Sequence, residues 1–311
     1  MQGIQPNFLK SLVLIANDFG FSVTDQENKA DLRVLVDPLK KMSINNERDV
    51  VILAEPEVVR PDLYDYKFLK TTKYLLPLGK YRADRLDLEY FVNWPVELPN
   101  YNKVKKNRNK KFAIVNEHKF SSSKRSQYGL RREVIKYFET KNPGTLDLYG
   151  VEWNISKRLE IKRRLYALRN NKSVKSIDFK EAFSDFWRKY DSVKGHMHKD
   201  CEMLQEYTAS ICIENDIDYV SEKVWKSLYA GCPVIYVGPD LKYDLFLKDS
   251  VLLADDNINS IQIKLNHFNS NSTEDFSSKG LDFLNSSAFK NYSPENTANE
   301  FFSNLKGLLK V

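Results

Sequence analysis

The sequence predicts an α/β protein of two units, each with a parallel sheet covered by helices. Apolar runs typical of buried strands alternate with amphipathic segments along most of the chain. This alternation favours parallel sheets with helices on both faces. A basic stretch at residues 103–111 divides the pattern into two halves. The 311 residues suffice for two domains, because single cores rarely grow beyond about 250–300 residues. Two such units joined by a linker are expected to leave a cleft, which is a common ligand site.

The first half is expected to begin with a helix, NFLKSLVLIANDFG (7–20), which ends at Gly20. One side of this helix is apolar, at Phe8, Leu12, Ile15 and Phe19. Two continuous apolar runs follow, LRVLVD (32–37) and VVILAE (50–55), and both have the composition of strands buried on two faces. A shorter strand is expected at KYLLPLG (73–79).

The second half is expected to contain four strands: KFAIVNE, LDLYG, ASICIE and CPVIYVG. The segments LRREVIKYFE, DCEMLQEY and SEKVWKSLYAG have the periodicity of helices. A last helix, SPENTANEFFSNLKGLL, begins with Ser293 as a candidate N-cap and Pro294 in the first turn. Its apolar stripe contains Phe301, Leu305 and Leu308.

Charge limits the class of partner. The net charge of +6 and the pI of about 8.9 favour a phosphate-bearing substrate, an anionic membrane or nucleic acid. The basic stretch at 103–111 is either a solvated linker or a contact with an anionic membrane or substrate. Because the sequence has no nucleic-acid-binding motif, nucleic acid is not an expected partner.

Targeting signals are not expected in this chain. No apolar run approaches the ~20 residues of a membrane-spanning helix, and the first residues lack the pattern of a secretory signal. The cysteines, Cys201, Cys212 and Cys232, are odd in number and are expected to be free thiols in a reducing compartment. These features predict a cytoplasmic protein, with a peripheral place at the inner face of the membrane as the alternative.

Polar residues are concentrated between the strand ASICIE and the helix that follows it: Glu214, Asn215, Tyr219, Ser221, Glu222 and Lys223. In open parallel sheets, ligands gather at the carboxyl ends of strands and the amino ends of helices. Ser221 is placed to cap the helix, and the free N–H groups of the helix, together with Lys223, suit phosphate oxygens. Glu222 suits sugar hydroxyls or a base edge. The stretch therefore fits a nucleotide, and its other interpretation is a capped helix with a surface acid–base pair.

Metal sites are less specific interpretations. Asp216 and Asp218 have the D-x-D spacing that can hold Mg²⁺ or Mn²⁺ against a diphosphate. His196 and His198 lack a nearby third ligand. Neither pair is specific, and no resident metal is expected.

The stretch IENDIDYVSEKVWKSLYAGCPVIYVGPD (213–240) resembles the donor-binding signature of the GT10 family of α-1,3/1,4-fucosyltransferases. The segment FAIVNEHKFSSSKRSQYGLRREVIKYFE (112–139) is similar to the opening of the family's donor domain, and ILAEPEVVRPDLYDYKFL (52–69) to its acceptor-side motif. The resemblance covers roughly residues 48–240. Ile213 and Ser221 depart from the aromatic residue and the threonine that are common in the family, and YVG stands where many members have YWG.

The resemblance implies a GT-B fold, in which two Rossmann-like domains face each other across a cleft. The expected boundaries are 1–108 for the acceptor-binding domain, 109–290 for the donor-binding domain and 291–311 for the C-terminal helix. This helix is a candidate to pack back across the cleft. The implied reaction is an inverting transfer of L-fucose from GDP-fucose to a GlcNAc-type hydroxyl of a glycan, as in the synthesis of surface polysaccharides. No cofactor is obligatory in this reaction, and stimulation by a divalent cation stays open.

The family pattern also implies roles for single residues. Arg131 and Lys223 would neutralise the diphosphate, and Glu55 would be the general base. The remaining donor-site candidates are Glu214, Asn215, Tyr219, Ser221 and Glu222. Glu57 could take the place of Glu55 as the base, and Arg132, Lys124 or Arg125 could take the place of Arg131. Two other functions stay possible: transfer from another nucleotide sugar, and an inactive glycan-binding protein.

Overall fold

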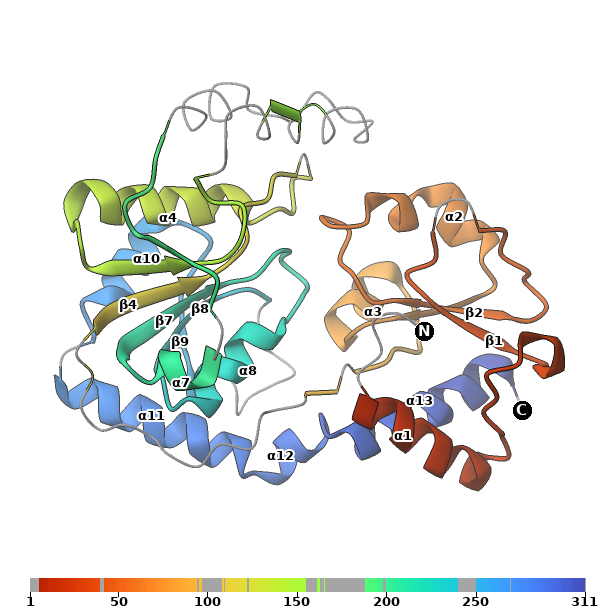
Figure 1. Ribbon diagram of the computed structural model, residues 1–311. Helices are drawn as coiled ribbons and strands as arrows, with labels where there is room; N and C mark the ends of the chain where they lie inside the picture. Colours follow the sequence, from red (N-terminus) through yellow and green to blue (C-terminus); the bar gives the residue numbers. More distant parts are fainter. Residues whose placement is uncertain are drawn as a thin grey trace. The chain divides into compact units, whose positions relative to one another are not determined.

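The computed structural model describes residues 6–39, 42–93, 95–96, 108, 110–121, 123–154, 161–162, 165, 188–197, 200–239, 250–268 and 270–310. The chain forms two compact units (Figure 1). The first contains residues 1–97 and 285–311, and the second contains residues 98–284. Sequence analysis placed these boundaries at 108 and 290. Most of the basic stretch and His198 lie outside the described residues.

The first unit has a parallel sheet of β1 (Arg33–Val36), β2 (Asp49–Leu53) and β3 (Tyr74–Pro77), in the order β1-β2-β3. All residues of the central strand β2 are buried, as the apolar run predicted. The same prediction is wrong for β1, where Val34 is 42% exposed. The reason is that β1 lies at the edge of the sheet.

Short helices connect and cover these strands. They are η2 (Glu27–Lys29), η3 (Pro61–Tyr64), α2 (Tyr66–Thr71) and α3 (Lys80–Leu86). The expected first helix is α1 (Pro6–Ile15), which continues as the 3₁₀ turn η1 (Ala16–Phe19) and ends at Gly20 with a left-handed φ of 80°. Gly20 is suited to this position because glycine has no Cβ to clash in the left-handed region.

The C-terminal helix α13 (Pro294–Leu309) belongs to the first unit and packs against α1. The two helices share an apolar core that includes Phe8, Ile15, Phe301, Phe302 and Leu305. The Ser293 side chain accepts a hydrogen bond from the N–H of Asn296, so the predicted N-cap is confirmed. The chain thus returns to its first unit after completing the second.

Within the described residues, the sheet of the second unit has six parallel strands: β4 (Lys110–Val115), β5 (Leu146–Tyr149), β6 (Val193–Gly195), β7 (Tyr207–Ile213), β8 (Val234–Val237) and β9 (Leu252–Leu253). Their order is β6-β5-β4-β7-β8-β9, and every neighbouring pair is parallel. Counted within the unit, this is 3-2-1-4-5-6, the order of a Rossmann fold. The order reverses between β4 and β7, and ligands of such sheets bind at that point.

Helices cover both faces of this sheet (Figure 1). On one face, α4 (Tyr128–Lys141) and α10 (Ile258–Leu265) share a core with β4, β5, β7 and β8. On the other lie α7 (Asp200–Leu204) and α8 (Glu222–Tyr229), with α11 (Ser270–Leu284) packed against α8. The short helix α12 (Ser287–Lys290) then precedes α13. No helix in these described ranges is long and apolar enough to cross a membrane.

Candidate functional site

The carboxyl ends of β4 and β7 mark the reversal point of the second sheet. Their pairing extends from Lys110 with Tyr207 to Ala113 with Ser210, whereas the strands continue to Val115 and Ile213. A cavity of about 40 Å³ is lined by residues of both strands, α7 and α8: Val115, Leu204, Ser210, Ile211, Cys212, Glu222, Lys223, Lys226 and Ser227. This volume holds one water molecule, whereas pockets for drug-sized ligands measure about 300–1,000 Å³.

Glu214 directly follows β7 and is 1% exposed. One carboxylate oxygen, Oε1, accepts hydrogen bonds from the Ser221 N–H at 2.8 Å and the Tyr236 hydroxyl at 3.3 Å. The other, Oε2, is buried and has no hydrogen-bond partner in the described part of the chain. Burial raises the pKa of Glu214, an effect that the charge of Lys223 opposes.

Asn116 follows β4 in the same way and was missed by sequence analysis. Its side chain is 2% exposed, and both Oδ1 and Nδ2 lack a hydrogen-bond partner among the described residues. The backbone around it is firmly held: its N–H donates to the Tyr149 carbonyl at 2.8 Å, and its carbonyl accepts from Trp153 Nε1 at 2.6 Å. The signal that could have found it is a polar residue directly after a buried strand, which is the signal that identified Glu214.

The amino end of α8 is formed as predicted. The Ser221 hydroxyl caps the helix by accepting from the Lys223 N–H at 3.4 Å. Lys223 Nζ lies 3.0 Å from Glu222 Oε1, and their side chains are 22% and 56% exposed. Although desolvation raises it, the pKa of Glu222 is lowered on balance, chiefly by the charge of Lys223. The end of the helix therefore presents a half-buried cation beside an exposed carboxylate.

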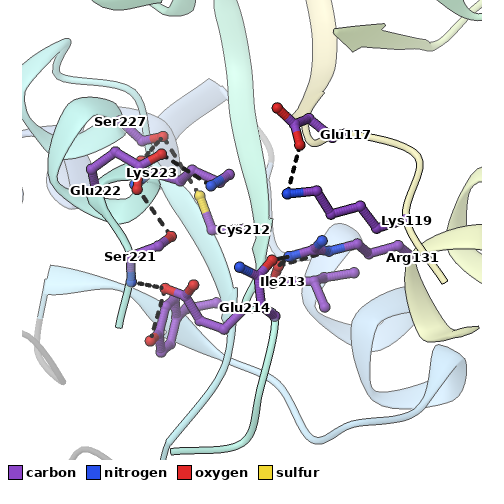
Figure 2. Close-up of polar contacts among 12 residues, drawn as sticks. Glu117, Lys119, Arg131, Cys212, Ile213, Glu214, Ser221, Glu222, Lys223 and Ser227 are labelled. Carbon is purple, nitrogen blue, oxygen red and sulfur yellow. Dashed lines mark hydrogen bonds and ion pairs between the residues drawn. The ribbon is translucent and has the colours of Figure 1, made fainter. Parts of the chain in front are cut away.

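Arg131, in the first turn of α4, extends inward to the end of β7 (Figure 2). The guanidinium group donates to the Ile213 carbonyl and, at 2.8 Å, to Asn215 Oδ1. It is 3% exposed, and desolvation lowers its pKa to about 10, so it is a cation at neutral pH. Arg131 and Asn215 are thus brought together, but here Arg131 fixes the segment after β7. Its predicted contact with phosphate stays a prediction.

Asp216 and Asp218 face inward toward Arg125. Arg125 Nη2 lies 2.8 Å from Asp216 Oδ1 and 2.7 Å from Asp218 Oδ2. Both aspartates are buried, and burial, together with the neighbouring charge of Asp218, raises the pKa of Asp216. In the metal hypothesis, Asp216 and Asp218 would bind Mg²⁺ or Mn²⁺. In the structure, both carboxylates instead form ion pairs with Arg125. The described ranges contain no cluster of three or more His, Cys, Asp or Glu residues suited to a metal ion.

Two more basic residues near the start of α4, Arg132 and Lys124, have different environments. Arg132 donates to the Lys119 carbonyl at 3.1 Å and packs over the Phe120 ring, so it holds the loop after β4. Lys124 is exposed. In the same loop, Lys119 forms an ion pair with Glu117 at 2.7 Å (Figure 2).

Tyr219 lies in the loop between β7 and α8. It is partly exposed, and its N–H donates to the Asp216 carbonyl at 3.4 Å. The loop therefore holds Tyr219 through its backbone, and its predicted role in the donor pocket stays a prediction.

Glu55 lies in the first unit, just beyond the end of β2. This is also the carboxyl edge of a parallel sheet, so both units present their candidate residues at the edge where ligands of such sheets bind. The second candidate base, Glu57, forms an ion pair in which its Oε2 lies 2.7 Å from Arg85 Nη1. The structure thus groups Glu214, Asn215, Ser221, Glu222, Lys223 and Arg131 in one unit and places Glu55 in the other.

Neither a protein-family model nor a curated protein matches this sequence. Solved structures do match. S. aureus TarM, in a structure with UDP, has a TM-score of 0.51 and 11% identity, over 84% of this chain and 51% of TarM. A Rickettsia africae glycosyltransferase has a TM-score of 0.51 and 11% identity, over 100% of this chain and 84% of its own. Anabaena HepE, in complex with UDP and glucose, has a TM-score of 0.51 and 8% identity, over 83% of this chain and 72% of HepE.

These similarities establish the fold. The chain has an α/β fold of the GT-B type with two Rossmann-like domains, as sequence analysis predicted. The chain spans about half the length of TarM. None of these three structures is named as a fucosyltransferase, so membership of the GT10 family stays a prediction.

Proposed function

We propose that this protein is a glycosyltransferase that binds a nucleoside diphosphate sugar at the carboxyl edge of its second sheet. The observation that carries the proposal is the pair of buried side chains with unsatisfied polar atoms, Asn116 and Glu214, one after each strand at the reversal point. Leaving a buried polar group unpaired costs about 1–3 kcal/mol. Because native proteins pair nearly all such groups, a ligand that satisfies them accounts for their presence.

The amino end of α8 complements these two side chains. It offers the backbone N–H groups of the first turn, a positive helix end and the ammonium of Lys223 to the diphosphate. Glu222, which is exposed, is suited to accept hydrogen bonds from sugar or ribose hydroxyls. Arg131 contributes by fixing Asn215, and Tyr219 lies in the same loop.

For the donor, two candidates have specific support. The sequence resembles the GT10 family in the donor segment, which favours GDP-fucose. The structures of TarM and HepE that match this fold contain UDP, which favours a UDP sugar. We place GDP-fucose first, because its support includes the residues of the site itself, and a UDP sugar second.

The proposed chemistry is a single inverting displacement. Glu55 accepts the proton of an acceptor hydroxyl, whose oxygen forms a bond to the anomeric carbon of the sugar. The bond from that carbon to the diphosphate breaks, and the negative charge that develops on the leaving group is stabilised by Lys223 and the α8 amides. The acceptor is a GlcNAc-type hydroxyl of a glycan. No obligatory cofactor takes part, and the proposed location is the cytoplasm or the inner face of the membrane.

The experiment is a donor panel. The purified chain is incubated with GDP- and UDP-sugars, with and without EDTA, and hydrolysis and transfer to GlcNAc-containing acceptors are measured. The proposal expects turnover of GDP-fucose and competition by GDP at lower concentration than by UDP. If the protein prefers UDP, the proposed donor changes to a UDP sugar, and the proposed type of reaction stays the same. Nucleotide binding without hydrolysis or transfer of any sugar would instead identify an inactive glycan-binding protein, and absence of nucleotide binding would refute the proposal.

A further inference from the structure

The turn that carries Glu55 is held by charged side chains from other segments of the first unit. After β2 ends at Leu53, Ala54 and Glu55 leave the sheet, and Pro56 follows. Backbone N–H and C=O groups beyond the end of a strand have lost their sheet partners and need others. Here the partners come from the segment after β1, from η3 and from α3.

Asp37 satisfies the N–H groups of the turn. Its Oδ1 accepts from the Ala54 N–H at 2.9 Å and its Oδ2 from the Glu55 N–H at 2.9 Å. Asp37 has a left-handed φ of 43°, which aspartate and asparagine tolerate better than most residues. Arg60 fixes this conformation by donating to the carbonyls of Asp37 at 3.0 Å and Pro38 at 2.7 Å.

Arg82, on α3, satisfies the carbonyl groups. Its side chain is fully buried, and Nη1 donates to the carbonyls of Leu53, Ala54 and Glu55 at 2.7, 3.1 and 3.2 Å. The Tyr64 hydroxyl adds a second hydrogen bond to the Glu55 carbonyl at 2.8 Å. The peptide groups on both sides of the Glu55 Cα are therefore held.

Stability alone is a weak explanation for this arrangement. Burial of a charged group costs free energy that its hydrogen bonds often only offset, and well-packed neutral groups can stabilise a fold as well. In Asp37, burial raises the pKa even though the two N–H donors and the charges of Arg60 and Arg82 act to lower it. Charge-assisted hydrogen bonds, however, are shorter and restrict geometry more than neutral ones. The arrangement therefore gives the chain a backbone segment of fixed geometry.

We propose that Asp37 and Arg82 are positioning residues that fix the direction in which the Glu55 side chain leaves the edge of the sheet. The inference rests on the proposed function, which assigns the general base to Glu55. A general base must lie within about 2.6–3.2 Å of the proton that it accepts, directly or through one water molecule. The backbone dihedrals of Glu55 determine where its carboxylate can reach, and Asp37 and Arg82 hold those dihedrals from opposite sides.

The test compares two aspartates that contact the two ends of β2. Asp37→Asn keeps a residue that tolerates the left-handed region but replaces one of the two acceptor oxygens. The matched control is Asp49→Asn at the beginning of β2. The Asp49 side chain is 0% exposed. It accepts hydrogen bonds from Arg33 at 2.8 and 2.7 Å and from the Asn45 N–H at 2.8 Å, and neither of these partners belongs to the Glu55 turn.

Two readouts separate positioning from folding. Amide hydrogen exchange at Ala54 and Glu55 reports the turn directly, whether or not the protein turns over a substrate. Steady-state kinetics report the reaction, and calorimetry reports nucleotide affinity. Asp37→Asn is expected to speed exchange at both amides at least about tenfold. It should also lower kcat about 10- to 100-fold, since small displacements of a catalytic group have effects of that size. Nucleotide affinity should stay unchanged.

Three results would overturn the inference: unchanged exchange at the two amides, faster exchange with an unchanged kcat, or equal loss of kcat in Asp49→Asn. If the wild-type protein transfers no sugar at all, the proposed function fails and the catalytic part of the inference fails with it, while the exchange data still decide whether Asp37 holds the turn. If Asp37→Asn does not fold, the same measurements on Arg82→Lys apply. Lysine keeps the charge and has three donors but lacks the fixed planar geometry of the guanidinium, so the inference requires values between those of the wild type and Arg82→Met.

Discussion

Replacing Lys223 with methionine removes the cation at the amino end of α8 and keeps a long apolar side chain. Lys223 forms an ion pair with Glu222 at 3.0 Å, and the Glu222 side chain is 56% exposed. Exposed ion pairs stabilise proteins by about 0–1 kcal/mol. The free energy of unfolding should therefore fall by less than about 1 kcal/mol, and the fold should persist.

The effect on ligand binding should be larger. A hydrogen bond between an ammonium and a phosphate oxygen contributes about 1.5–3 kcal/mol. At about 1.36 kcal/mol for each factor of ten, this corresponds to about 10- to 150-fold weaker binding of GDP or UDP. The variant also loses the charge that opposes the raised pKa of Glu214, so the ionised form of that buried carboxylate becomes less favourable.

The assay is titration calorimetry with GDP and with UDP, together with urea unfolding. Lys141→Met is the matched control, because Lys141 is exposed in the last turn of α4 and its loss changes the net charge equally. It should weaken nucleotide binding less than about threefold, since exposed charges are screened over about 8–10 Å. Equal losses in the two variants would show a long-range charge effect, and an unchanged affinity in Lys223→Met would refute the assignment of Lys223 to the diphosphate.

Four further variants test other contacts of the two sites. Glu55→Gln should leave GDP affinity unchanged and lower kcat at least about 100-fold, the contribution of a general base, as measured by calorimetry and a transfer assay. Asn116→Ala should weaken nucleotide binding about 5- to 100-fold in calorimetry without lowering stability, because its amide has no partner among the described residues. Gly150→Ala should lower the free energy of unfolding by about 1–3 kcal/mol in urea, since φ is 142° and a Cβ would lie 2.0 Å from the Asn116 carbonyl oxygen. Because burial raises the pKa of Glu214, the native state keeps a proton that the unfolded chain releases. The free energy of unfolding therefore falls as pH rises from the ordinary glutamate pKa toward the raised value. Glu214→Gln should remove this pH dependence of the free energy of unfolding, measured by urea unfolding at several pH values.

Local signals explain why much of the second unit could be predicted. A strand, a serine cap and an amphipathic helix follow one another within 209–231, and each depends on residues close in the sequence. Strand-end polarity then identified Glu214. By contrast, the composition of LRVLVD indicated a strand but not its place in the sheet, because an edge position depends on which strands pair. Helices α2, α3 and α10 to α12 were not predicted, and α2, α3 and α12 are too short for a clear periodicity.

Residues that work across long sequence separations were harder to find. Asp37 precedes Glu55 in the sequence and Arg82 follows it, and both contact the Glu55 turn. No short sequence pattern connects the two residues. Asn116 satisfied the rule that identified Glu214, but its importance lies in the absence of a partner among the described residues, which only coordinates reveal. Arg131 was interpreted as a phosphate ligand because the family resemblance implied that role, and its burial depends on the packing of α4 against the end of β7, which the local sequence does not show.

The two buried arginines indicate a common physical solution at the two sheet edges. Arg82 donates to the Leu53 carbonyl at the end of β2, shortly before Glu55, and Arg131 donates to the Ile213 carbonyl at the end of β7, directly before Glu214. In each case the last strand residue is still paired with one neighbouring strand, Leu53 with Pro77 and Ile213 with Val237, and a planar guanidinium supplies further donors to its carbonyl group. The acid that follows then starts from a backbone segment held by charge-assisted hydrogen bonds. An arginine near such a strand end can therefore set the position of a functional carboxylate without touching the substrate itself.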